Sequence, residues 1–128
     1  MDRCLSKREG LLLFWCEGDK PTDDLRKIQL TNSNPTILEY FTQWLEIHYK
    51  IPRKLMKMRL HLWEGSDEMS AKEFWSGQLQ IPLTNFTKTW FKPRGHKDKH
   101  PFGICRVSVS SKALMERVRN DLSSEFLT

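Results

Sequence analysis

Glu17 is the residue whose type and position most directly suggest chemistry. It follows six consecutive apolar residues, Leu11 to Cys16. A helix that is apolar on every side is expected to be buried on every side. Glu17 would then lie at the C-terminal end of a buried helix, where the helix dipole disfavours an acid. This position predicts a cation beside Glu17, and the alternative is that the carboxylate is simply solvated.

Capping residues define the helix that would carry Glu17. Ser6 and Glu9 have the spacing of a capping box, in which each side chain binds the backbone N–H of the other residue. Gly18 can adopt the left-handed turn that ends many helices. The spacing therefore predicts a helix over residues 6–17.

Polar and apolar residues alternate on three predicted strands, which cover residues 25–31, 55–63 and 104–110. Alternation with a period of two is typical of a half-buried strand. The predicted inward residues are Ile28, Leu30, Met58, Leu60, Leu62, Cys105, Val107 and Val109. The strands contain neither Asp nor Glu, which favours a face that binds an anion over a merely solvated face.

The outward side chains are of the types that contact phosphates and base edges in nucleic acids. The chain has 21 Lys and Arg against 16 Asp and Glu, and its net charge of +5 also favours an anionic partner. We therefore expect the outward face and nearby residues to bind a nucleic acid. The predicted DNA-binding residues are Lys20, Lys27, Gln29, Lys57, Arg59, His61, Lys88, Lys92, Arg106 and Ser108.

The composition predicts one packed domain over residues 1–128, since five Trp and seven Phe can build a core in a chain of this length. Three cysteines, at positions 4, 16 and 105, fit a reduced cytoplasmic protein, associated with the nucleoid when bound to DNA. Their spacing does not favour a zinc site. Apolar runs are short, so we expect no signal peptide and no membrane partner.

Helices are expected between and after the strands, which predicts an α+β fold. Asn34 and Pro35 begin one helix, which continues to Lys50. Ser70 and Glu73 form a second capping box and begin a short helix. Residues 84–92 read as another extended segment, residues 93–101 as a lysine-rich loop and residues 112–126 as an amphipathic helix.

The order of these elements resembles the LAGLIDADG homing endonuclease fold. The nine-residue motif of that family would lie on residues 10–18, with Glu17 in place of the closing Asp. Further stretches that look like compact members of the family are Leu30–Pro35, His61–Gly65, Phe74–Ser76 and Phe102–Cys105. The resemblance covers nearly the whole chain, and it implies an antiparallel sheet with helices on one face.

The resemblance also implies a homodimer, paired through the helix at residues 6–17, whose two sheets lie in the DNA major groove. Glu17 matches the acid that holds a divalent cation, normally Mg²⁺, for phosphodiester hydrolysis. Asn32 matches a polar residue that positions water near the metal. Ser108 stands where the family has a basic residue, and Arg106 lies two residues earlier on the same face. The implied catalytic set is Glu17, Asn32 and Arg106.

Three classes of function follow from these observations. The first is a metal-dependent DNA endonuclease, and the second is a DNA-binding transcriptional regulator of the same fold that does not cleave. The third is an interaction module that does not bind DNA and uses its aromatic helices. Metal binding at Glu17 separates the first class from the second, and salt-dependent DNA binding separates both from the third.

Overall fold

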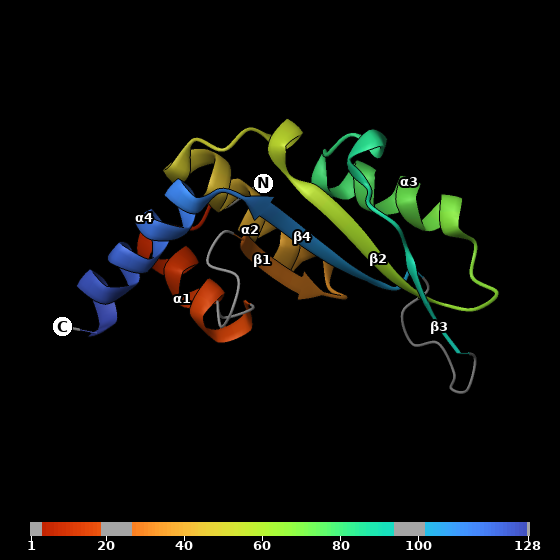
Figure 1. Cartoon of the computed structure of the whole chain (residues 1–128), viewed down its shortest axis with the longest axis horizontal. Coiled ribbons are helices and arrows are strands. Elements are labelled where there is room, and N and C mark those ends of the chain that lie inside the picture. The colour runs from red at the N-terminus through yellow and green to blue at the C-terminus, as the bar shows by residue number, and fades with distance from the viewer. Residues whose placement is uncertain (1–3, 19–26, 94–101, 128) are drawn as a thin grey trace.

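The computed structural model describes residues 4–18, 27–93 and 102–127. In chain order the helices and strands are α1 (Lys7–Glu17), β1 (Lys27–Asn32), α2 (Pro35–Tyr49), β2 (Lys57–Trp63), α3 (Glu68–Leu79), β3 (Trp90–Lys92), β4 (Ile104–Ser110) and α4 (Lys112–Leu122). Short 3₁₀ turns precede β2 and β3, and a π-helical turn follows α4. Figure 1 shows α1 and α4 at one end of the molecule and α3 with β3 at the other. The α+β class predicted from the sequence is confirmed.

The four strands form one sheet in the order β1-β4-β2-β3. β4 pairs antiparallel with both β1 and β2, as expected. The expectation of a wholly antiparallel sheet is wrong, because β3 pairs parallel with β2 over three residues. The chain crosses through α3 between these two strands, and a helical crossover of this kind returns the chain in the same direction.

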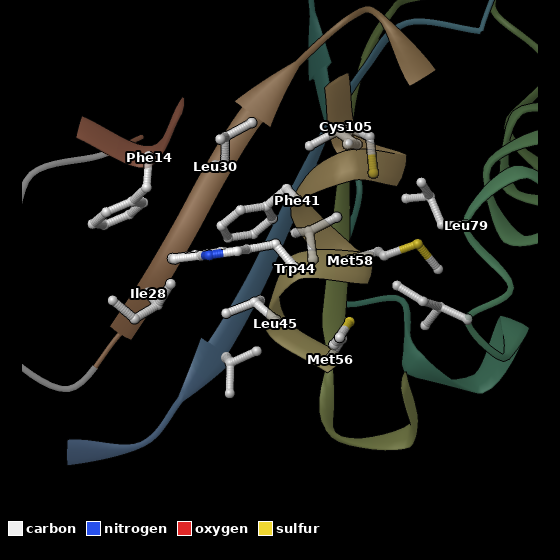
Figure 2. Close-up of a cluster of buried hydrophobic side chains, with 14 of the residues drawn as sticks. Phe14, Ile28, Leu30, Phe41, Trp44, Leu45, Met56, Met58, Leu79 and Cys105 are labelled. Carbon is white, nitrogen blue, oxygen red and sulfur yellow. The ribbon is translucent and has the colours of Figure 1, made fainter. Parts of the chain in front are cut away.

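One buried cluster joins the inward face of the sheet to all four α-helices. All eight predicted inward residues of β1, β2 and β4 are buried. In Figure 2, Ile28 and Leu30 of β1 lie beside Phe41 and Trp44 of α2. The prediction that helices cover one face of the sheet is therefore confirmed, and the polar side chains of the strands lie on the opposite face, here called the outer face.

The capping residues explain where the helices begin. Ser6 Oγ accepts from Glu9 N at 3.1 Å and Glu9 Oε1 accepts from Ser6 N at 2.9 Å, which confirms the first capping box. The second predicted box is wrong. Asp67 caps α3 instead, accepting from Ser70 N at 3.2 Å, so this helix begins three residues earlier. Aspartate is among the preferred N-cap residues, and its carboxylate also accepts from the Ser70 hydroxyl.

Helix α1 differs from expectation in its burial and in its end. Leu11 and Phe14 are buried, but Leu12 is 50% exposed and Cys16 is exposed, so the described residues leave one side of the helix uncovered. Gly18 is extended, with φ −78°, and its N–H donates to Phe14 O at 2.7 Å. The predicted left-handed turn is therefore wrong, because the chain leaves α1 by bridging to Leu30 of β1.

The expected extended segment over residues 84–92 is a strand only at its end. Asn85 is buried, and its Nδ2 donates to Lys54 O at 3.0 Å and to Met56 O at 2.8 Å. These bonds fix a 3₁₀ turn, Leu83–Asn85, before the chain reaches the sheet edge as β3. Most of the lysine-rich stretch at 93–101 lies outside the described residues. Among the described helices, none is both long and apolar enough to cross a membrane.

Candidate nucleic-acid interface

The pairing of the strands sets the outer-face side chains in rows across the sheet. From one end of the sheet to the other, the rows are Lys27–Ser110, Gln29–Ser108–Lys57, Thr31–Arg106–Arg59 and Ile104–His61–Trp90. Trp63 and Lys92 pair beyond them at the edge. Seven residues predicted to bind DNA thus share three adjoining strands, because side chains of one strand reach the same face at every second residue.

Two arginines lie at the centre of this face. Arg106 of β4 and Arg59 of β2 are directly opposite each other in the antiparallel register. Arg106 Nε donates to Thr31 Oγ1 at 3.2 Å, and Arg59 Nε donates to Lys88 O at 3.0 Å. Like charges directly opposite on neighbouring strands destabilise a sheet. Each of these two hydrogen bonds uses only the Nε of its guanidinium. The two neighbouring positive charges are therefore placed where they could bind an anion between them.

An aromatic group borders the arginines at the β3 edge. The rings of His61 and Trp90 have centroids 5.4 Å apart at an interplanar angle of 55°. The Lys92 ammonium lies 5.8 Å from the centroid of the Trp63 ring. His61 and Lys92 are predicted site residues, whereas neither tryptophan is predicted from the sequence. The signal that could have found Trp90 is its position between Lys88 and Lys92, with alternate residues on one face.

Positive charge dominates the electrostatics around His61. Burial lowers the pKa of its imidazole, and the nearby charges of Arg106, Lys92 and Arg59 lower it further. Its Nε2 is shielded from solvent and has no hydrogen-bond partner within the described part of the chain. The outer face therefore holds a neutral imidazole among cations, and a bound anion would favour its protonation.

The remaining predicted DNA-binding residues differ in their placement. Lys27, Lys57 and Lys88 are exposed, and Lys92 is half-buried against Trp63. Lys20 lies outside the described residues. Three exposed lysines beside a central arginine pair can contact phosphates at several points, which is how proteins bind DNA without reading its sequence.

The three predicted catalytic residues do not all share one face of the sheet. Glu17 is exposed at the end of α1. Asn32 pairs with Cys105 on the helix-covered side, and its Oδ1 accepts from Asn34 N at 2.8 Å at the start of α2. Arg106 lies on the outer face of the sheet, so the side chains of Asn32 and Arg106 belong to opposite faces.

The residues that the structure describes do not by themselves supply the donors of a magnesium site. Mg²⁺ prefers near-octahedral oxygen ligands, usually with one or two carboxylates. The described residues contain no group of three His, Cys, Asp or Glu placed to hold a metal. Glu17 supplies one carboxylate, and the Asn32 oxygen is already used as a helix-start acceptor.

The uncovered side of α1 carries an apolar strip. Leu12, Trp15, Cys16 and Gly18 line a shallow depression there. The Trp15 ring packs on Phe126 from the C-terminal turn, with centroids 5.2 Å apart, so the end of the chain covers part of this side. Leu12 and Cys16 stay exposed, four residues apart on one face of the helix.

No family model, no curated protein and no solved structure matches this chain.

Proposed function

We propose that this protein is a LAGLIDADG-like DNA-binding protein whose outer sheet face contacts the major groove of duplex DNA. The observation that carries the proposal is the Arg59–Arg106 pair, opposed at the centre of a strand face that has no Asp or Glu. A fold gains nothing from opposing two arginines in this way, whereas a phosphate or a guanine edge between them would relieve their repulsion.

Binding without cleavage is the form of this function that the geometry favours. The outer face is assembled within one chain, while the Asn32 oxygen is already engaged by Asn34 N and its side chain lies on the face opposite Arg106. We therefore propose the DNA-binding regulator, which does not cleave, ahead of the endonuclease. The two can be told apart by incubating the protein with a randomised duplex library in Mg²⁺ or Ca²⁺ and sequencing bound and cut products. Mg²⁺-dependent cutting that Glu17→Gln abolishes would favour the endonuclease.

Replacing Lys57 and Arg59 together with Ala is expected to weaken duplex binding about tenfold or more and to flatten its salt dependence. A variant that makes fewer phosphate contacts releases fewer counterions when it binds. The slope of log affinity against log salt should therefore become shallower by about one for each contact that is lost. Anisotropy of a labelled duplex over a salt series measures both quantities. Absence of duplex binding by the unmutated protein at low salt would overturn the proposed function.

DNA binding is also expected to strengthen several-fold as the pH falls below about 6.5, the ordinary pKa of histidine. In the free protein burial, together with the charges of Arg106, Lys92 and Arg59, holds the pKa of His61 low. Phosphate beside these cations raises that pKa, so the complex takes up a proton that the free protein does not. Affinity measured from about pH 7.5 to about pH 5.5 should lose this dependence in His61→Gln.

A stability control belongs with this pH series. Since the folded pKa of His61 is lowered, the unfolded chain binds the proton more readily. The stability contributed by the neutral imidazole is therefore fully present at a pH above the pKa of His61 in the unfolded chain. It is lost as the pH falls through the lower pKa of His61 in the folded protein. Tighter binding despite this loss would support the proposal, and affinity that is flat with pH would contradict it.

We also propose that two copies pair through the uncovered side of α1. Leu12 is 50% exposed there, and Leu55, on a 3₁₀ turn far along the chain, is a matched control at 53%. Leu12→Glu is expected to convert a dimer to a monomer, because it buries a charge in the interface, while Leu55→Glu should not. Light scattering decides this, and a monomeric unmutated protein at high micromolar concentration would contradict the pairing.

A further inference from the structure

Trp90 is a large aromatic side chain that the core does not use. It is 56% exposed, the highest value for any aromatic residue in the described chain. It lies on β3, a three-residue strand at the edge of the sheet (Figure 1). Its indole contacts the His61 ring, with centroids 5.4 Å apart, and both side chains belong to the outer face. Contact with phosphates alone gives no reason to place an indole here.

Cations surround this aromatic pair. The charges of Arg59, Arg106 and Lys92 all act on His61, which contacts Trp90. Lys92 follows Trp90 by two residues on the same face and lies over the Trp63 ring. An apolar protein segment would have to desolvate these charges, whereas a nucleic acid would neutralise them. Charge complementarity therefore favours a nucleic acid as the occupant of this surface.

An exposed aromatic ring beside phosphate-binding groups is the arrangement by which proteins hold bases that have left the helical stack. Paired bases present only their edges in the grooves of a duplex, so an indole cannot stack on them. A base without a partner offers its whole face. The ring of Trp90 is held by His61 on a strand, which limits the conformational entropy that stacking would cost.

We propose that Trp90, supported by His61, is a stacking platform for one unpaired nucleobase, next to the phosphates that Arg59 and Arg106 bind. This inference rests on the proposed DNA binding and makes it more specific. The preferred ligand is a duplex that contains an unpaired or easily unstacked base. A matched duplex binds through the same cations but leaves the indole without a partner.

Three labelled duplexes of one length and sequence test this platform. One is fully matched, one has a single bulged adenosine, and one has the same bulge with an abasic sugar. The unmutated protein is expected to bind the bulged adenosine about tenfold more tightly than the other two, since stacking on one base is worth about that factor or more. A 2-aminopurine at the bulge should be quenched on binding, which reports the stack directly.

Substitutions at β3 separate stacking from general apolar contact. Trp90→Leu should abolish the preference for the bulged adenosine over the matched duplex, while Trp90→Phe should retain part of the preference. Phe91→Leu is the matched control, because Phe91 is 40% exposed but pairs with inward-facing Leu62. Both positions are exposed, so these variants should fold, and circular dichroism checks that they do.

The outcomes distinguish this inference from the function on which it rests. Equal affinity of the unmutated protein for all three duplexes would overturn the platform and leave the proposed DNA binding standing. Undiminished preference in Trp90→Leu would also overturn it. No binding to any duplex at low salt would overturn the proposed function and the platform with it. Loss of preference in Trp90→Leu, with retention in Phe91→Leu, would support the platform.

Discussion

Gly10→Ala is expected to lower the free energy of unfolding by about 3 kcal/mol, a large part of the stability of a domain of this size. Helix α1 crosses α2 so closely that a Cβ at Gly10 would overlap the indole of Trp44. Trp44 is fully buried, and its Nε1–H donates to Lys7 O at 3.1 Å. The added methyl group must therefore displace a packed ring and weaken this hydrogen bond, and urea denaturation measures the cost.

Gly77→Ala is the matched control for this substitution. Gly77 lies within α3, and a Cβ there would meet no atom within 4 Å beyond its chain neighbours and the backbone of its own helix. Alanine is favoured over glycine inside a helix by about 1 kcal/mol, so this variant should be more stable than the unmutated protein. Opposite signs for the two substitutions are the expected result. A Gly10→Ala variant as stable as the original would mean that α1 and α2 are not in such close contact.

The strands of this fold were predictable because their side chains alternate. In β2, Met58, Leu60 and Leu62 are buried while Arg59 and His61 between them are half-exposed. A strand with one face on a core must place successive residues on opposite sides, so the alternation encodes both the strand and its inward face. The same local rule revealed the basic outer face, because the residues between the apolar ones are the outward ones.

Features that depend on contacts between distant segments were not predictable in this way. The parallel pairing of β3 with β2 follows from the path through α3, which leaves no local pattern in a three-residue strand. The contact between His61 and Trp90 depends on that pairing and was missed with it. The burial of α1 was overestimated, because its composition is apolar on all sides while only one side, with Leu11 and Phe14, meets the core.

The side chain of Asn32 shows how one residue type can serve two purposes. An asparagine at the end of a strand can position water in an active site, as the resemblance implied. The same side chain can also accept a backbone N–H two residues on, and Asn32 does this with Asn34 as α2 begins. Short polar side chains compete for nearby backbone groups, so a residue of this type before a helix is weak evidence for catalysis.

The opposed arginines of the outer face imply that stability and binding conflict. Arg59 and Arg106 repel each other across β2 and β4, which costs the fold up to about 1 kcal/mol. Functional residues commonly carry such a cost. A substitution that relieves the repulsion should therefore stabilise the protein and weaken DNA binding, whereas a purely structural pair would show no effect on binding.

Arg106→Glu is expected to reduce duplex affinity about a hundredfold, equivalent to about 2.7 kcal/mol. It removes one cation from the centre of the face and places an acid where phosphate would bind. The same change sets opposite charges across the strands at Arg59, so thermal stability should be kept or raised. Arg119→Glu makes the same change of charge on an exposed position of α4 and should barely alter affinity.

Anisotropy and thermal melting of both variants resolve the source of the effect. Weak binding by Arg106→Glu with an unchanged or higher melting temperature would exclude unfolding as the cause. Equal losses of affinity in both variants would indicate attraction by net charge alone, without a defined site. Equal affinity of Arg106→Glu and the unmutated protein for DNA would show that the outer face is not the interface. A nucleic acid bound at the centre of that face would lie against the introduced carboxylate and be repelled by it.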